Sequence, residues 1–507
     1  MMERHARIDR VEDAPGAPRA AQGATARAAA AVLASPIPLA AVLTIGIAAR
    51  CRQYLGNPSY WYDEAYVILN VIEKPFHALV GPLELQQVAP PLFLWMLRGL
   101  YLIAGTPEPV MRLPAMVCGL VALPLMIPLA QRVVGNPGWA WAVAFLAVSY
   151  HAVVHTCEVK PYAGDLLVTQ AILVAAQACL TGSGVQRRCW VALCAAAVLA
   201  PWMSFPSVFV LCGGGLAVLT AIMRRRERAV WMWWVTFVAL LSVSSLVLWY
   251  GAARYHNSPQ QQAAFARHFI NASSLGAALA STVSCLIGLG SYASTAIGVP
   301  LLLFGGLGAV VLSRRSPALV MLLVSPLGIA GLAAALRSYP LGDRLGLFAA
   351  PCIWLLAAAG IGATTQRLRG RFAGAGWLVL ALLLLPDGIR TTQSLIVVQP
   401  QADFRSAFAY VQQHRLPGDT LWVSHPEVYE VYFGKEPPIL GAYTDPDVVE
   451  RAALAGRLWL VYTPQGPNRT NFPAVFERLL AVHSVPALRH EVAGLEVVLY
   501  VPGGGQR

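Results

Sequence analysis

Residues 60–66 place two adjacent carboxylates, Asp63 and Glu64, among aromatic side chains just beyond the first long apolar segment of the chain. Carboxylates at a membrane boundary are costly to desolvate, so they commonly face a functional cavity. We therefore interpret Asp63 as facing an active site at the membrane surface. The alternative is a solvated juxtamembrane loop whose acids take no part in chemistry.

Two later loops add residues of complementary type: Glu158 with Lys160, and Asp343 with Arg344. In a transfer from a phosphate leaving group, a carboxylate deprotonates or orients the acceptor hydroxyl, and a cation or metal ion meets the charge that develops on the phosphate. Each pair also has a simpler interpretation. Glu158 and Lys160 could form a surface ion pair or a helix cap, and Asp343 and Arg344 could be ordinary interfacial charges. His77, His151 and His155 lack metal-like spacing, which favours packing roles.

The composition is that of a polytopic membrane protein. Of the 507 residues, 57% are hydrophobic and only 12% are charged, whereas soluble domains carry about 25% charged residues. The net charge of +12 could suggest nucleic acid, but the basic residues cluster in short loops between apolar segments, where they act as topology signals. We expect no nucleic-acid partner. The nine cysteines do not define a compartment.

The apolar segments predict about eleven transmembrane helices. Their expected bounds are 32–50, 110–131, 139–156, 163–181, 189–203, 206–222, 230–250, 296–312, 317–335, 345–363 and 373–386. Residues 92–105 are also apolar but too few for a span of about 20 residues, so we expect an interfacial helix that begins at the Pro90-Pro91 pair. Residues 51–109 and 251–295 are interpreted as long loops.

Basic clusters follow the even-numbered helices, at Arg132, Arg187, Arg224, Arg314 and Arg367. Under the positive-inside rule these loops and the N-terminus are cytoplasmic. The loops 51–109, 251–295 and 339–344, the loop of Glu158 and everything after residue 387 then lie outside.

Three regions are expected: a disordered cytoplasmic tail at 1–30, a transmembrane catalytic domain at 31–390, and a small extracytoplasmic α/β domain at 399–502. Residues 404–414 and 472–482 read as helices, and residues 420–423, 458–462 and 496–501 as strands. This domain shows neither a Gly-rich phosphate loop nor metal-spaced His and Cys residues, so we expect it to support or recognise while the chemistry lies elsewhere.

Five stretches in order, residues 61–65 (WYDEA), 87–94 (QVAPPLFL), 112–114 (RLP), 158–165 (EVKPYAGD) and 339–345 (YPLGDRL), resemble bacterial glycosyltransferase family 39. That family belongs to the type-C superfamily with the protein O-mannosyltransferases and the lipid A aminoarabinose transferase. The resemblance implies a type-C fold in the bacterial inner membrane. It also implies inverting transfer of a sugar from polyprenyl phosphate to a lipid, glycan or protein acceptor outside the membrane.

The resemblance also implies roles for particular residues. Asp63 matches the catalytic acid of the first outer loop, with Glu64 beside it, and Glu158 matches the acid of the second outer loop. The lipid phosphate would be bound by Lys160 and Arg344, with Tyr162 and Arg112 as further donor-binding residues. A divalent metal ion at Asp63 and Glu158 is left open.

Two other classes of function compete with this interpretation. A transporter or flippase for lipid-linked glycans would place ionisable residues mid-helix along a path and show internal repeats, whereas here the charges lie in loops. A membrane-anchored assembly protein would use the tail and leave the acids inert. Transfer of label from a polyprenyl-phosphate sugar would separate the enzyme from both.

Overall fold

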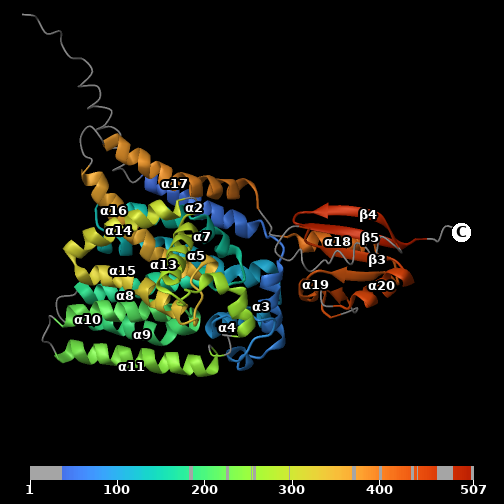
Figure 1. The fold of residues 1–507 in the computed structure, drawn as a ribbon, viewed down its shortest axis with the longest axis horizontal. Helices are drawn as coiled ribbons and strands as arrows, with labels where there is room; N and C mark the ends of the chain where they lie inside the picture. Colours follow the sequence, from blue (N-terminus) through green and yellow to red (C-terminus); the bar gives the residue numbers. More distant parts are fainter. Residues whose placement is uncertain are drawn as a thin grey trace, which may run out of the picture.

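The computed structural model describes residues 37–503, apart from 137, 182–185, 224–227, 253, 255–257, 296, 368–372, 399–401, 436–438, 442–443 and 465–483. The expected tail at 1–30 and the expected helix at 472–482 therefore lie outside the described residues. A large helical body is joined at one end to a small α/β unit (Figure 1).

The helical body contains apolar helices of 5 to 26 residues. Such helices satisfy their own backbone hydrogen bonds, as a lipid environment requires. They are α2 (Ile37–Leu55), α5 (Glu108–Val133), α6 (Trp139–Val148), α7 (Tyr150–Val154), α8 (Tyr162–Thr181), α9 (Arg187–Met203), α10 (Ser207–Ile222), α11 (Arg228–Gly251), α13 (Leu275–Ala293), α14 (Gly298–Arg315), α15 (Pro317–Ala335), α16 (Ala350–Arg367) and α17 (Ala373–Ile396). Within the described ranges, seven helices are long and apolar enough to cross a membrane, or eight if a bent pair is one span. The protein is a multi-pass membrane protein.

The bent pair begins with α6 and turns by 58° before the segment 150–157. Ser149 lies at the bend, where its hydroxyl accepts a hydrogen bond from the backbone N–H of Ala152 and so caps α7. The 3₁₀-helix η2 (His155–Cys157) follows. After this bend, Glu158 and Lys160 lie at the same end of the helical body as the loop that follows α2.

Helix α13 corrects the interpretation of residues 251–295 as a loop. Glycine and serine dilute its apolar residues, yet it is 19 residues long with a mean hydropathy of 1.5, and Ser274 caps its first turn. The backbone N–H of Ile270, just before α13, bonds the carbonyl of Ala334 at the end of α15. Helix α13 is one of the seven helices that are long and apolar enough to cross a membrane.

The loop after α2 contains α3 (Tyr62–Glu73), the 3₁₀-helix η1 (Ala78–Val80) and α4 (Pro91–Ala104). Helix α4 has 14 residues and carries a proline at its N-terminus, so the segment expected to be interfacial is a short helix. Two further connections contain α12 (Pro259–Ala264) with η4 (Ala266–His268), and η5 (Asp343–Ala349).

The α/β unit is built on a five-stranded sheet of order β2-β1-β3-β5-β4. Its elements are α18 (Phe404–His414), β1 (Thr420–Val423), α19 (Pro426–Phe433), β2 (Leu440–Gly441), α20 (Pro446–Ala455), β3 (Leu458–Tyr462), β4 (Ser484–Val492) and β5 (Leu495–Pro502). Strands β1, β2 and β3 are parallel, and β4 and β5 are antiparallel. The predicted helix at 404–414 and the predicted strands at 420–423 and 458–462 coincide with α18, β1 and β3.

The two faces of this sheet bury different neighbours, because alternate residues of a strand point to opposite sides. Trp422 and Leu460 pack with Val449 of α20. Val423 and Val461 belong to a second cluster that includes α18 and α19 together with residues of α3 and α4. The α/β unit and the first loop therefore share one hydrophobic core.

Candidate functional site

Asp63 and Glu64 occupy the first turn of α3. Acidic residues are favourable there because the unpaired N–H groups and the dipole of a helix N-terminus are positive. Glu64 accepts a hydrogen bond from the backbone N–H of Trp61 at 3.3 Å, which caps the helix. One turn of helix thus projects two adjacent carboxylates into different surroundings.

The Asp63 carboxylate is held between two cations from distant parts of the chain. Lys160 Nζ lies 3.0 Å from Oδ1, and Arg344 Nη1 lies 2.6 Å from Oδ2. The side chains of Asp63 and Lys160 are 9% and 6% exposed, whereas that of Arg344 is 31% exposed. The cluster of these three residues, hereafter the Asp63 cluster, is buried with one accessible cation.

The charges of the Asp63 cluster shift the proton affinities of its members. Burial raises the pKa of the Asp63 carboxyl, but Lys160 and Arg344 outweigh burial and hold that pKa below its ordinary value. Burial lowers the pKa of the Lys160 ammonium, and Asp63 offsets only part of this effect. With all three groups ionised, two cations face one anion, and this formal net charge of +1 suits an anionic ligand.

Gln87 joins the Asp63 cluster, a role that sequence reasoning did not assign. Its side-chain amide accepts from Lys160 Nζ at 2.7 Å and donates towards Asp63 Oδ1 at 3.5 Å. Leu85 and Gln86, which precede it, have positive φ angles of 57° and 54°, a region unfavourable for residues with side chains. This unusual loop geometry, invisible in the sequence, orients Gln87.

Arg344 is presented at the start of η5, where Tyr162 at the start of α8 lies beneath it. Its guanidinium carbon is 5.8 Å from the centroid of the Tyr162 ring, within the range of a cation–π contact. The neighbouring Asp343 turns away and pairs with Arg267 and His268, each at 3.0 Å. Tyr162 therefore lies where it can orient Arg344.

Glu64 is held by a separate and fully buried cation. Arg112 donates from Nε to Oε1 at 2.9 Å and from Nη2 to Oε2 at 2.7 Å, and the backbone N–H of Val159 donates to Oε1 at 2.8 Å. Arg112 also donates to the carbonyls of Pro58 and Ser59. The structure thus places Arg112 with Glu64 rather than in the Asp63 cluster, where the two residues tie α3 to α5 and to the loop of Glu158.

Glu158 belongs to a hydrogen-bonded chain. Its Oε2 lies 2.7 Å from Nδ1 of His155, and Nε2 of His155 contacts the Tyr292 hydroxyl. The Tyr162 ring meets His155 edge-on at 4.9 Å. His155, which spacing alone assigned to packing, is thus the partner that fixes the Glu158 carboxylate.

The site residues do not form a convincing metal centre. Among the described residues, no group of three or more His, Cys, Asp or Glu side chains is placed to hold a metal ion. Both Asp63 oxygens face cations, and a divalent ion there would be repelled by Lys160 and Arg344. The donor set at Asp63 and Glu158 therefore does not fit a metal, and we assign none of the chemistry to one.

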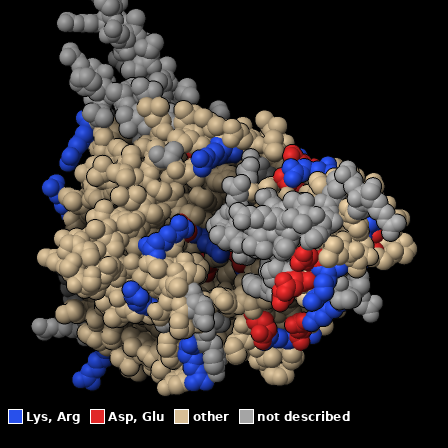
Figure 2. Space-filling view, turned by 45° about the vertical axis from the view of Figure 1, so that its right-hand side comes forward, with Lys and Arg blue, Asp and Glu red and all other residues tan. Residues whose placement is uncertain are grey.

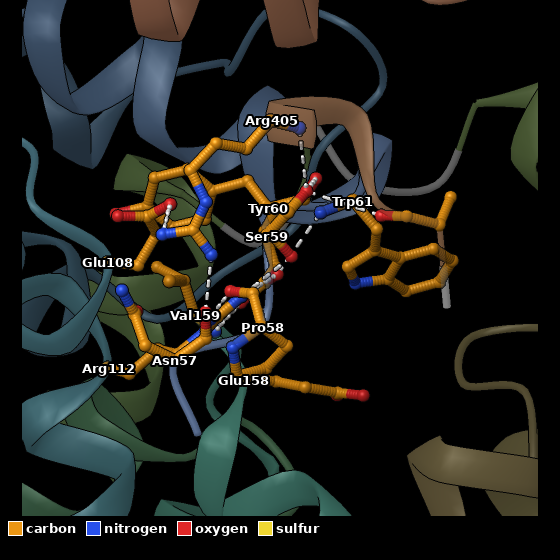
Figure 3. Close-up of polar contacts among 12 residues, drawn as sticks. Asn57, Pro58, Ser59, Tyr60, Trp61, Glu108, Arg112, Glu158, Val159 and Arg405 are labelled. Carbon is orange, nitrogen blue, oxygen red and sulfur yellow. Dashed lines mark hydrogen bonds and ion pairs between the residues drawn. The ribbon is translucent and has the colours of Figure 1, made fainter. Parts of the chain in front are cut away.

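A cavity of about 150 Å³ lies beside these residues. It is lined by Gln53, Pro58, Ser59, Trp61, Glu64, Arg112, Tyr150, Val154, Cys157, Glu158 and Ser394. Figure 3 shows the segment from Asn57 to Trp61 with Arg112, Glu158 and Arg405 around it. The cavity is thus adjacent to Glu64 and Glu158, whereas Asp63, Lys160 and Arg344 are not among its lining residues.

The α/β unit packs directly on α3. The ring of His425 stacks on Tyr62, next to Asp63, at 4.3 Å and 14°, and burial lowers the pKa of His425 to about 4, so the ring is neutral at pH 7. Tyr432 donates to Glu108 at 2.8 Å, and Arg405 pairs with Glu108 at 3.3 Å. Figure 2 shows acidic and basic side chains gathered on this unit, whereas the visible face of the helical body carries scattered basic side chains.

Comparison with known proteins gives likeness in structure only. No protein-family model and no curated protein matches the sequence. Among solved structures, the archaeal oligosaccharyltransferase AglB from Archaeoglobus fulgidus, in complex with an inhibitory peptide and a dolichol-phosphate, is 11% identical with a TM-score of 0.52, over 92% of this chain and 74% of that one. ArnT from Cupriavidus metallidurans bound to undecaprenyl phosphate is 13% identical with a TM-score of 0.48, over 91% and 97% of the two chains.

The two structures are type-C glycosyltransferases, and the AglB match is the one whose TM-score exceeds 0.5. At this level of identity the likeness concerns the fold alone. The chain has the type-C glycosyltransferase fold.

Proposed function

We propose that this protein is a glycosyltransferase that moves a sugar from a polyprenyl phosphate to an acceptor hydroxyl. The observation that carries this proposal is the Asp63 cluster, in which one carboxylate and two cations meet in a buried site with a formal net charge of +1. The structural likeness to AglB with a bound dolichol-phosphate supports the same class of donor.

The charges of the Asp63 cluster balance those of the donor before transfer and those of the leaving phosphate after it. A sugar linked to polyprenyl phosphate is a diester with one negative charge, so donor, Asp63 and the two cations sum to zero. During transfer the acceptor O–H bond breaks, a bond forms from that oxygen to the anomeric carbon, and the bond from that carbon to the phosphate oxygen breaks. The leaving phosphate gains one negative charge as Asp63 takes the proton, and the sum is again zero.

This balance reconciles a lowered pKa with a role as general base. In the resting site Lys160 and Arg344 stabilise the ionised Asp63 and make it a weak base. As charge develops on the phosphate, both cations are drawn to it and the proton affinity of Asp63 rises. The base therefore becomes effective when the leaving group departs, which is the moment that lowers the barrier.

The other residues hold these groups in place. Gln87 bonds Lys160 and Asp63, Tyr162 supports Arg344, and the pair of Glu64 and Arg112 anchors the first turn of α3. A donor anchored in the membrane plane and an oriented base remove much of the entropy of encounter. The acceptor oxygen approaches the face of the sugar opposite the phosphate, so the transfer inverts the anomeric centre.

We place the reaction on the extracytoplasmic face of the bacterial inner membrane. Arg132, Arg314 and Arg367 lie in the last turns of α5, α14 and α16, and Arg187 begins α9. Under the positive-inside rule these helix ends are cytoplasmic. The α/β unit packs on α3, so it shares the outer face with the site.

The decisive experiment uses the purified full chain with labelled undecaprenyl-phosphate sugars and an extract of envelope acceptors. The parent protein is expected to move label to an acceptor, and Asp63→Asn is expected to abolish transfer. Movement of label across a vesicle membrane without transfer would instead identify a flippase. The parent failing to do either would leave the assembly role as the better account.

A further inference from the structure

The carboxylate and the two cations of the Asp63 cluster are held by different parts of the molecule. Lys160 follows η2 and Arg344 lies in the first turn of η5, so both belong to the helical body. Among the described residues, neither cation forms a hydrogen bond or ion pair with the α/β unit. Asp63 lies in α3, which packs against α19 of that unit. The α/β unit can therefore act on the carboxylate without acting directly on the cations.

Helix α3 depends on such packing because its own sequence defines its start weakly. The helix has 12 residues, and helices this short are marginal unless they pack on other elements. Trp61 occupies the N-cap and its side chain makes no cap hydrogen bond, whereas Ser, Thr, Asp or Asn would supply one there. Arg112 holds one side of the first turn through Glu64. The orientation of Asp63 also depends on what holds the other side.

Polar contacts from the α/β unit hold the segment that leads into this turn. Arg405 donates from its guanidinium to the carbonyl of Asn57 and from its backbone N–H to Ser59 Oγ, the latter at 3.4 Å. The backbone N–H of Tyr60 donates to the Tyr432 hydroxyl at 2.9 Å. In Figure 3, Arg405 lies against the segment from Asn57 to Trp61. Three of the positions just before α3 are thus fixed by the α/β unit.

His425, at the N-cap of α19, holds the first turn itself. Its ring stacks on that of Tyr62, and its Nδ1 lies 3.5 Å from the Tyr66 hydroxyl. Tyr62 and Tyr66 are four residues apart and so lie on one face of α3. His425 is buried in this contact. Because Tyr62 immediately precedes Asp63, a shift of the Tyr62 ring moves the carboxylate relative to Lys160 and Arg344.

We propose that the α/β unit is part of the catalytic apparatus, with His425 as a positioning residue that aligns Asp63 for proton transfer. The inference rests on the proposed function. It assigns donor binding to the helical body and alignment of the base to the α/β unit. Misplacing a reacting group by about 1 Å lowers a rate by about 10²-fold. Loosening the contact at His425 therefore lowers kcat and leaves donor affinity, which depends on Lys160 and Arg344, unchanged.

The test measures kcat, the KM for a labelled donor and the affinity for bare undecaprenyl phosphate, using the full chain in nanodiscs. His425→Ala removes the stacked ring and is expected to lower kcat by about tenfold to hundredfold, with KM and lipid affinity unchanged. His425→Phe keeps a flat ring against Tyr62 and is expected to recover most of the lost kcat. Tyr432→Phe removes only the hydroxyl that receives the Tyr60 N–H. It is expected to lower kcat by about threefold to tenfold, as loss of one hydrogen bond predicts.

A matched control lies within the same unit. The ring of His490 stacks on Tyr410 at 3.9 Å and 13°, in a contact between β4 and α18. His490→Ala should leave kcat unchanged, and so should Lys435→Ala, which removes the ion pair with Glu73 at the other end of α3. An equal fall of kcat in His490→Ala and His425→Ala would show that general loss of stability is responsible. That result would overturn the proposal.

Hydrogen exchange reports the same contact without an assay of transfer. The backbone amides of residues 60–66 should exchange faster in His425→Ala than in the parent, and at the parent's rate in His490→Ala. Protection elsewhere in the chain shows that the variant is folded. If kcat stays at the parent's value in both His425→Ala and Tyr432→Phe, the α/β unit does not position Asp63, whatever the exchange rates are.

That failure is distinguishable from failure of the proposed function itself. In the first case the parent moves label to an acceptor, Asp63→Asn does not, and His425→Ala matches the parent. In the second case the parent moves no label, although faster exchange in His425→Ala still reports the contact between α19 and α3.

Discussion

Asp63 and Glu64 are neighbours in sequence and chemically alike, but their surroundings differ in kind. Glu64 meets one buried arginine in a bidentate pair, with side-chain exposures of 1% and 3%. Asp63 meets a lysine and an arginine, and that arginine is 31% exposed. The charges of Glu64 and Arg112 cancel. Around Asp63 there is one cation more than there are anions, and the Arg344 side chain is partly exposed. From this comparison we propose that Glu64 serves stability and Asp63 serves the chemistry.

The largest expected effect is the loss of transfer in Asp63→Asn. Removing a general base lowers the rate by about 10²–10⁴-fold. The amide fills the same volume but leaves the buried Lys160 without its counter-ion, so thermal unfolding of Asp63→Asn is measured alongside to show that the variant is folded under the assay conditions. Initial rates with a labelled undecaprenyl-phosphate sugar measure this effect, with Glu73→Gln as the matched surface control. Turnover equal to that of the parent would refute the assignment of Asp63.

Glu64→Gln tests the other half of the comparison through stability. It leaves the buried Arg112 guanidinium without its counter-ion, which destabilises a protein by about 3–5 kcal/mol. Thermal unfolding in detergent should therefore begin at a clearly lower temperature than in the parent. The double variant Glu64→Gln/Arg112→Gln, which removes the unpaired charge, should recover part of the loss. If Glu64→Gln unfolds at the same temperature as the parent, the ion pair between Glu64 and Arg112 does not stabilise the fold.

Lys160→Ala and Arg344→Ala should weaken donor binding by about tenfold to hundredfold each, since hydrogen bonds to charged groups contribute about 1.5–3 kcal/mol. Lys160→Arg keeps the charge and should retain part of the affinity. Titration with undecaprenyl phosphate in nanodiscs measures these affinities. Unchanged affinity in either alanine variant would remove that residue from the phosphate site.

The smallest expected effect is that of mildly acidic pH on folding stability. The pKa of Asp63 is lower in the folded than in the unfolded state, so its contribution to stability is complete above the unfolded value and is lost only as pH falls through the folded value. Between about pH 5 and pH 7 we therefore expect no loss of stability from this group. On the alkaline side, the lowered pKa of Lys160 predicts that donor affinity falls before pH reaches 10.5. Titrations with the donor lipid at a series of pH values, with Lys160→Arg for comparison, measure this loss of affinity at alkaline pH.

The sequence identified the residue types of the site but not their pairing. Asp63, Lys160 and Arg344 could be named from motifs in separate loops, yet only the bend after α6 and the placement of η5 bring them together. Arg112 was assigned to the donor because it lies in a motif, and its contact with Glu64 depends on how α5 packs against α3. Gln87 depends on two left-handed residues that no composition signal predicts.

The same limit explains the errors in the fold. Strands β1 and β3 were predicted because both are continuous apolar runs, buried on two faces. Helix α13 was missed because Gly276, Ser281, Ser284 and Gly288 lower its hydropathy, although its contacts with η5 and α14 stabilise it in the folded chain. Tertiary packing, which a single sequence does not reveal, decided this case.

The hydrophobic core shared by α3, α4 and the α/β unit has a consequence for biogenesis. Residues 404–502 are translated after every membrane helix described above, so α3 lacks its final packing partners while those helices insert. The first turn that carries Asp63 then reaches its mature position only when the last part of the chain has folded. Under the proposed function, an incompletely synthesised protein would therefore be inactive.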